Sequence, residues 1–330
     1  MKVIGRIIFV LAMIALIVTL VSIIPSDQWF IRTVDMVRVL LVFLCIALLV
    51  IGLFLKTRLR WLTIAALILV IGINAWRVWP YWAVADTEVP LAQAEASQLT
   101  CFSALSANVK VKNTGYQQVA DQIRKYDPDV LFLMETDDKW LAELEPVLSG
   151  YPTVRRHPQP KAFGLAFATR VPASKINVVE NTHRDTPTLY ATLQPAGFPP
   201  VEFIGLHPKP PLPGWDTGER DRNIVNAGVQ TPDRLPNAVV MGDFNDVPWS
   251  RTTEKFHDMG NWNDPRIGRG SFGTFPADYV PLGWPLDQLM MKGDIQLGSF
   301  EILDDNGSDH LAVLANICVP SDRASANSPG

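Results

Sequence analysis

The stretch Val239-Val240-Met241-Gly242-Asp243-Phe244-Asn245 decides how the rest of the chain is interpreted. Its apolar, β-branched start predicts a buried strand, and the glycine predicts a turn that delivers Asp243 and Asn245 at the strand's end. Residues two apart on an extended chain project to the same side, so a carboxylate that activates water would lie beside an amide that orients one. Taken alone, the stretch is equally compatible with a polar turn after a core strand.

The N-terminal part of the chain is unusually apolar. Hydrophobic residues make up 48% of the sequence, and the excess lies in three runs at about residues 3–24, 36–55 and 61–79. Each run is about as long as a helix that crosses a bilayer, and no cleavage site of a signal peptide follows the first one. The alternative, three buried helices of a soluble core, fits runs of this length poorly. We therefore expect residues 1–82 to form a membrane anchor of three spans.

Basic residues predict how this anchor is oriented. Lys2 and Arg6 open the first run, and Lys56, Arg58 and Arg60 crowd the short loop between the second and third runs. Loops rich in Lys and Arg stay in the cytoplasm. An odd number of spans then places everything after residue 82 outside the cytoplasm. The expected protein is a multi-pass protein of the inner or plasma membrane, in contact with the lipid bilayer through its spans.

The remainder of the chain divides into a linker, one domain and a tail. Residues 83–99 are small and polar and predict a linker, residues 100–319 are long enough for a domain with a substantial core, and residues 320–330 have the composition of a disordered tail. Strands are expected near 99–109, 130–134, 163–169, 176–179, 188–193, 201–206, 239–243, 286–291, 295–303 and 311–319, and helices near 115–126, 139–148, 218–230 and 250–259. Many strands without regular βαβ alternation favour an α/β fold of two packed sheets flanked by helices.

Polar side chains follow many of these expected strands. They are Asn108, Glu135, His207, Asp243, Asn245, Asp287 and the pair Asp309-His310. Strand ends that meet at one edge of a sandwich form a site. Carboxylate and amide oxygens suit Mg²⁺ or Mn²⁺, whereas zinc would favour a His/Cys cluster that the sequence lacks.

Six short motifs around these residues occur in an order that resembles the endonuclease/exonuclease/phosphatase superfamily. They are Ser-Ala-Asn-Val (106–109), Pro-Asp-Val-Leu-Phe-Leu-Met-Glu-Thr (128–136), Gly-Leu-His-Pro (205–208), Gly-Asp-Phe-Asn (242–245), Leu-Asp-Gln-Leu (286–289) and Gly-Ser-Asp-His (307–310). The superfamily includes type I deoxyribonuclease, abasic-site endonucleases, neutral sphingomyelinases and inositol-polyphosphate phosphatases. The resemblance covers residues 100–319 and implies a four-layer α/β sandwich.

The resemblance also implies a role for each polar residue. Glu135 would be the principal metal ligand, with Asp309 and Asn108 as further candidates. Asp243 would activate the attacking water, and Asn245 and Asn108 would hydrogen-bond the phosphate. His310, oriented by Asp287, would bind the phosphoryl oxygens, and His207 would stabilise the leaving oxygen. Without the family, His207 is also compatible with a loop histidine braced by prolines.

Two residues depart from family patterns. Lys110 stands where the abasic-site branch has an acid, which argues against that branch, and Gln288 stands where many members have an aromatic residue or histidine. Neither residue is needed for the mechanism. His157, His183 and His257 match no motif and are interpreted as surface or packing residues.

The substrate is not decided by the sequence. From residue 90 onward the chain has 21 Lys plus Arg and 29 Asp plus Glu, a net charge of −8, whereas non-specific nucleases usually present a basic surface. We therefore predict a Mg²⁺-dependent phosphodiesterase or phosphomonoesterase acting on a lipid head group, a nucleotide or a nucleic acid. An extracytoplasmic DNA nuclease and a non-catalytic membrane binding protein are the alternatives, and no protein partner is deducible. Four tryptophans in expected loops would either pack beneath those loops or contact lipid or bases: Trp215, Trp249, Trp262 and Trp284.

The cysteines allow one more prediction from the resemblance. Cys45 lies in the second run, which leaves Cys101 and Cys318 for the domain. In the family's fold the first and last strands are antiparallel neighbours, which brings these two residues nearly opposite each other. A disulfide would close a loop of over 200 residues and add on the order of 4 kcal/mol. Two free thiols are the equal alternative, because the register can slip by one residue.

Overall fold

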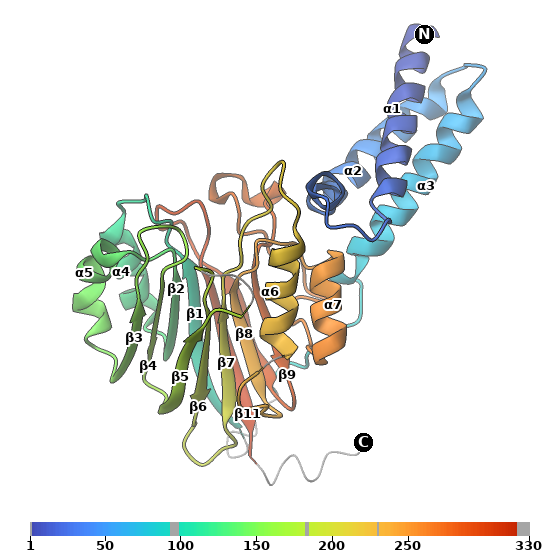
Figure 1. The fold of residues 1–330 in the computed structure, drawn as a ribbon. Helices are drawn as coiled ribbons and strands as arrows, with labels where there is room; N and C mark the ends of the chain where they lie inside the picture. Colours follow the sequence, from blue (N-terminus) through green and yellow to red (C-terminus); the bar gives the residue numbers. More distant parts are fainter. Residues whose placement is uncertain (1, 93–98, 182–184, 230, 322–330) are drawn as a thin grey trace.

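The computed structural model describes residues 2–92, 99–181, 185–229 and 231–321 (Figure 1). Three long helices come first: α1 (Lys2–Val21), α2 (Trp29–Phe54) and α3 (Arg60–Val78). All three are long and apolar enough to cross a membrane. α2 begins at Trp29, well before the second apolar run. The extra turns carry Arg32 and Asp35, which are buried.

Two β-sheets form the centre of the domain. The first has the order β10 (Gln296–Ile302), β11 (Val313–Pro320), β1 (Leu99–Asn108), β2 (Val130–Met134), β4 (Leu165–Thr169) and β3 (Thr153–His157). The second has the order β5 (Ala173–Val179), β6 (Thr188–Leu193), β7 (Val201–Leu206), β8 (Ala238–Asp243) and β9 (Asp287–Lys292). The pairs β1–β2 and β7–β8 are parallel, and the other pairs are antiparallel.

Helices cover the outer face of each sheet. α4 (Tyr116–Tyr126) and α5 (Asp138–Leu148) pack on the first sheet, and α6 (Gly218–Val229) and α7 (Arg251–Gly260) pack on the second (Figure 1). Two short 3₁₀ helices, η1 (Trp79–Tyr81) and η2 (Ala277–Leu282), lie in connections. The expected four-layer α/β sandwich is confirmed.

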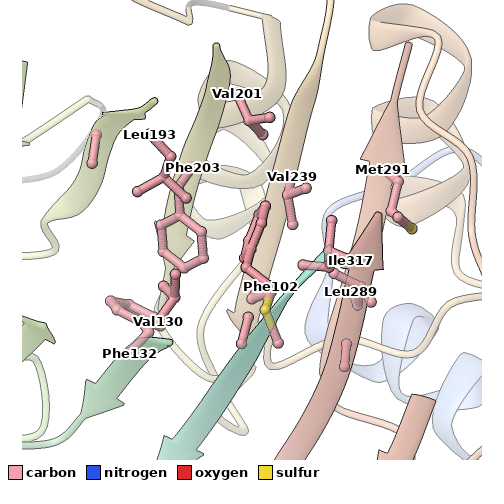
Figure 2. Close-up of a cluster of buried hydrophobic side chains, with 14 of the residues drawn as sticks. Phe102, Val130, Phe132, Leu193, Val201, Phe203, Val239, Leu289, Met291 and Ile317 are labelled. Carbon is pink, nitrogen blue, oxygen red and sulfur yellow. The ribbon is translucent and has the colours of Figure 1, made fainter. Parts of the chain in front are cut away.

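The main hydrophobic core lies between the two sheets. Figure 2 shows side chains of both sheets meeting there, including Phe102 and Phe132 from the first sheet and Phe203 and Val239 from the second. The rings of Phe132 and Phe203 lie 6.1 Å apart, and all four side chains are buried. Each such side chain contributes roughly 1.5–3 kcal/mol through the burial of apolar surface. This core fixes the two sheets against each other and so fixes the relative positions of their strand ends.

The glycine of the opening stretch is required by a close approach of two strands. Gly242 has φ 144°, and a Cβ atom there would lie 2.0 Å from the carbonyl oxygen of Leu206. No residue with a side chain fits, so β8 can pass close to the end of β7. The expectation of an extended Asp243–Asn245 segment was wrong, because β8 ends at Asp243 and Asn245 has φ 50°. The backbone turns there, and Phe244 enters the core.

The two ends of the domain are joined covalently. β1 and β11 are antiparallel neighbours with Cys101 opposite Cys318, and the two cysteines form a disulfide with a Cα–Cα distance of 4.0 Å. The predicted bridge is thus confirmed. β11 extends to Pro320, one residue into the expected tail, and residues 322–330 of that tail lie outside the described residues. Residues 93–98 of the expected linker lie outside them too.

The anchor packs directly on the domain. Trp249 Nε1 donates to the carbonyl oxygen of Asp35 (2.8 Å), and Trp284 Nε1 donates to that of Met36 (2.5 Å). Arg32 Nη2 donates to Thr252 Oγ1 (2.9 Å). The first turns of α2 therefore rest on the loops that follow β8 and precede β9. Packing is the correct interpretation for three of the four loop tryptophans, Trp249, Trp262 and Trp284, whereas Trp215 is exposed.

Candidate active site

Five strands bring most of the predicted polar residues to one edge of the sandwich. Asn108 ends β1, Glu135 follows β2, His207 follows β7, and Asp243 ends β8. Asp287 begins β9 and is the register partner of Asp243. Because the two sheets pack face to face, residues far apart in the sequence meet at this edge.

Glu135 is held at the edge by main-chain and amide donors. Asn108 Nδ2 donates to Glu135 Oε1 (3.0 Å) and to Asp243 Oδ2 (3.1 Å), and the backbone N–H of Val111 donates to Glu135 Oε2 (3.1 Å). Glu135 has φ 61°, a left-handed conformation that is uncommon for residues other than glycine. Such conformations cluster at functional sites, where surrounding contacts maintain them. The carboxylate is therefore fixed in place by its surroundings.

His310 and Asp287 form a hydrogen-bonded pair, as predicted. His310 Nδ1 lies 2.8 Å from Asp287 Oδ2, and both side chains are buried. The other ring nitrogen, Nε2, faces Asp243 Oδ2 at 3.6 Å. Burial lowers the pKa of His310, but the carboxylates of Asp287 and Asp243 outweigh it and raise that pKa to about 10. The imidazolium form is thus favoured at neutral pH.

His207 approaches the same carboxylate from the other side. Its Nε2 lies 3.7 Å from Asp243 Oδ2, and its ring packs against Phe163 with 5.5 Å between ring centroids. Burial lowers the pKa of His207 below the ordinary value, although Asp243 opposes the shift. Its Nδ1 is buried without a hydrogen-bond partner among the described residues. His207 is therefore a neutral, partly unsatisfied histidine inside the site.

Asp243 is the common neighbour of both histidines. Burial raises the pKa of its carboxyl above the ordinary value, while the charge of His310 lowers it. Its Oδ1 accepts from the backbone N–H of Asn245 (2.7 Å). The side-chain amide of Asn245 donates to the carbonyl oxygen of Pro208 (3.0 Å), which ties the ends of β7 and β8 together.

Three other residues singled out in the sequence lie in less central positions. Asp309 forms an ion pair with Lys110 Nζ (2.9 Å), and both side chains are partly exposed. Gln288 is buried, accepts from Arg266 Nη2 (2.8 Å) and donates to the carbonyl oxygen of Asp246 (2.7 Å). Gln288, the residue that departs from the family pattern, therefore links the side chain of Arg266 to the main chain at Asp246.

A pocket of about 470 Å³ opens over these polar groups. Its polar floor contains Glu135, His207, Asp243, Asn245 and His310. Its walls are mostly apolar and come from three regions: Thr33, Met36 and Val37 of α2; Ala162, Phe163, Pro210 and Pro211; and Phe275, Trp284 and Leu286. Of these wall residues, sequence reasoning had singled out Trp284 alone as a possible contact for lipid or bases. The α2 residues carry no motif, and only the fold brings them beside a site about 100 to 270 residues away in the chain.

The donor set at this site suits a divalent cation with oxygen ligands. Ligand atoms of Asp243, Asp287 and His310 lie within 4.8 Å of one another, and Asp287 Oδ1 is buried without a hydrogen-bond partner among the described residues. A charged His310, however, has no lone pair to coordinate an ion. Carboxylates, with Glu135 at the pocket, are therefore the groups that fit such an ion.

Comparisons with known proteins agree with this geometry. Residues 105–310 match the model of the Endonuclease/Exonuclease/phosphatase family, and the chain belongs to this family of phosphate-ester-cleaving enzymes. D. rerio TDP2 complexed with single-strand DNA product is similar in fold, with a TM-score of 0.55, 15% identity, and coverage of 66% of this chain and 99% of TDP2.

Bacterial proteins of known structure are similar in fold as well. An endonuclease/exonuclease/phosphatase from Beutenbergia cavernae has a TM-score of 0.53 and 17% identity over 67% of this chain and 72% of its own. A family protein from Bacteroides thetaiotaomicron has a TM-score of 0.52 and 15% identity over 67% and 96%. A search of curated proteins gave no match.

Proposed function

We propose that the protein is a membrane-anchored, Mg²⁺- or Mn²⁺-dependent phosphoesterase whose site faces outside the cytoplasm. The observation that carries the proposal is that His310, Asp243 and Glu135 line one pocket, with Asp287 hydrogen-bonded to His310. A binding protein would not require a charged histidine, a neutral histidine and a carboxylate of raised pKa around one point.

The chemistry follows from the state of each side chain. Glu135 would hold the divalent ion, and the ion would polarise a phosphoryl oxygen and lower the pKa of nearby water. Asp243 accepts a proton from the attacking water, because its Oδ2 faces the pocket. His310 donates hydrogen bonds to phosphoryl oxygens as they gain charge, and Asp287 keeps its ring oriented and charged. His207, buried with a free ring nitrogen, stabilises the leaving oxygen.

Two of the predicted metal ligands receive different roles in this proposal. The side-chain oxygen of Asn108 accepts from the backbone N–H of Lys110 (3.0 Å), so its amide nitrogen is directed at the carboxylates. We assign Asn108 to orienting Glu135 and Asp243. Asp309, paired with Lys110, is assigned to balancing charge beside the site.

Removal of the metal and of its ligand tests the proposal. The full-length protein in detergent should hydrolyse bis(p-nitrophenyl) phosphate with Mg²⁺ and stop with EDTA. Glu135→Gln keeps the shape of the side chain and should lower the Mg²⁺-stimulated rate by about a thousandfold, while thermal unfolding is unchanged. Glu145→Gln, at an exposed carboxylate of α5, is the matched control. Unchanged turnover in Glu135→Gln would refute the assignment.

The location is tested separately. The basic residues at both expected cytoplasmic ends of the spans support an extracytoplasmic domain. A reporter that is active only outside the cytoplasm should work when fused after Val319 and stay silent when fused at Thr57. The reverse pattern would place the domain in the cytoplasm.

A nuclease is the second candidate. It is favoured by the similarity in fold to TDP2, which was crystallised with single-strand DNA product. Nucleic acids are usually followed by Lys and Arg along their backbone. Neither residue type is present among the described residues that line the pocket. Arg220, a candidate for a basic patch, is buried against Asp221 and Asp246 and is not available to a substrate.

A further inference from the structure

The membrane helix α2 forms one wall of the pocket that contains the polar site. Thr33, Met36 and Val37 lie in its first turns and face the same space as His207 and His310. Trp284 also lines the pocket and fastens this wall by donating to the Met36 carbonyl oxygen. The part of the chain that is apolar enough to cross a membrane is thus part of the site itself.

This wall continues along α2 as an exposed apolar stripe. Helix residues spaced by three, four or seven share a face, so Val37 is followed by Leu40 and Leu44, and Met36 by Phe43. Leu40, Phe43 and Leu44 are 38%, 62% and 55% exposed. In a bilayer these residues face lipid chains. A single helix face therefore runs from the pocket into the lipid-facing surface without a polar residue after Thr33.

The level of the pocket relative to the bilayer follows from aromatic residues. Trp29 and Phe30 begin α2, and Trp76 and Trp79 lie at the end of α3, where such side chains mark a membrane–water boundary. Met36 and Val37 lie about two turns further along α2 than Trp29. In Figure 1 the edge of the domain beside the start of α2 faces the helix bundle. Arg38 Nη1 donates to Asn74 Oδ1 (2.9 Å), which brings Met36 and Val37 to about the level of Trp76. The apolar end of the pocket is consequently near the expected membrane–water boundary, and its polar residues come from the domain.

The pocket combines a phosphate-ester site with an apolar wall, and neither Lys nor Arg is among the described residues that line it. We propose that the substrate is a phosphate ester carried by a membrane lipid, whose head group enters over His207, Asp243 and His310 while its chain lies along Met36, Val37 and Leu40. This inference rests on the proposed phosphoesterase activity and names the substrate class of that site. A soluble ester would leave the apolar wall unused, and a nucleic acid would meet neither Lys nor Arg among the described residues that line this pocket.

Two synthetic esters that differ only in their chain test the inference. Methyl p-nitrophenyl phosphate and hexadecyl p-nitrophenyl phosphate share one reacting centre and one leaving group. The full-length protein in lipid nanodiscs should hydrolyse the hexadecyl ester with a kcat/KM about 100-fold higher, which corresponds to three or four methylene groups buried against α2.

A substitution in the wall separates the chain site from the reacting centre. Val37→Trp should lower the ratio of kcat/KM for the hexadecyl ester to kcat/KM for the methyl ester at least about tenfold, because the larger side chain takes up the space of the alkyl chain. Ile46→Trp is the matched control, because Ile46 is exposed on the opposite side of α2 and should affect neither ester. Equal kcat/KM for the two esters, or equal losses in Val37→Trp, would overturn the lipid substrate and leave the phosphoesterase intact.

A binding measurement keeps the inference testable without turnover. A hexadecyl phosphate with a photoreactive diazirine in its chain should cross-link to residues 33–40 in nanodiscs, and Val37→Trp should reduce that product severalfold. Cross-linking without hydrolysis of either ester would refute the proposed activity and retain the lipid site. Absence of this product would overturn the lipid site, whatever the activity, and faster cleavage of single-stranded DNA than of the hexadecyl ester would replace it with a nuclease.

Discussion

Two buried charged clusters lie close together in this protein, and they differ in how their charges are matched. One is the site cluster of Glu135, Asp243, Asp287, His207 and His310. The other is the interface cluster, which joins the anchor to the domain. Its members are Arg32, Asp35, Arg38, Arg220, Asp221 and Asp246.

The interface cluster has a guanidinium for each carboxylate. Asp35 contacts Arg32 and Arg38 at 2.7 Å each, and Asp246 Oδ2 lies 3.3 Å from Arg220 and 3.5 Å from Arg32. The site cluster has three carboxylates and one histidine that is charged at neutral pH. Among the described residues it keeps two polar atoms without hydrogen-bond partners, Asp287 Oδ1 and His207 Nδ1, and the interface cluster keeps one, Arg32 Nε. Buried charged side chains alone therefore do not identify the site. An excess of carboxylates over positively charged side chains beside a pocket does.

The largest effect is expected from breaking the His310–Asp287 pair. His310→Ala should lower kcat on a soluble phosphodiester by about a thousandfold, and Asp287→Ala nearly as much, because the ring loses its orientation and charge. The double variant should lose little more than either single one. Multiplicative losses would show that the two residues act separately, and His257→Ala serves as the control histidine.

Disruption of the interface cluster should affect stability more than chemistry. Arg32→Met removes a partner of buried Asp35 and Asp246 and should cost about 3 kcal/mol of unfolding free energy. Turnover of a soluble ester by the folded protein should stay within about twofold. Arg58→Met, at an exposed position in the loop before α3, is the control for the loss of one positive charge. A large loss of kcat in Arg32→Met without a change in unfolding would make the two clusters one functional unit.

The smallest expected effect is a shift in the pH dependence of activity. It tests specifically the charges of the site cluster. The active form of His310 is charged, so activity should persist up to its pKa of about 10 and fall above it. On the acid side, the raised pKa of Asp243 should move the loss of activity above the ordinary range of an aspartate. Asp287→Asn removes the carboxylate charge that raises the pKa of His310 and should move the alkaline limit down by about one pH unit or more. If the alkaline limit of activity does not move in Asp287→Asn, the loss of activity at high pH belongs to a group other than His310.

Most of the fold was predictable because the buried strands are rich in apolar residues, as in Val130–Met134. β3 was missed, since Arg155 and Arg156 interrupt the pattern of an edge strand that is only partly buried. The start of α2 was placed too late for a related reason. Arg32 and Asp35 end the apolar run, yet their burial depends on Asp246 and Thr252, more than 200 positions away.

The candidate site was predictable to the extent that its residues follow strands. The pairing of Asp287 with His310 is confirmed. The conformations of Glu135 and Asn245 were not predictable, because positive φ angles at these residues depend on contacts with other strands. The apolar half of the pocket was not predictable either, because it is contributed by a helix outside the motifs.

The pairing of β1 with β11 determines when the domain can be completed during synthesis. β1 lies between β2 and β11, so its outer edge has no partner until Val313–Pro320 has been made. The first strand of the domain must therefore wait for the last one, and folding follows release of nearly the whole chain. On the proposed extracytoplasmic side, the polypeptide would cross the membrane unfolded. Oxidation of Cys101 and Cys318 would then be a late step that seals a sheet already assembled.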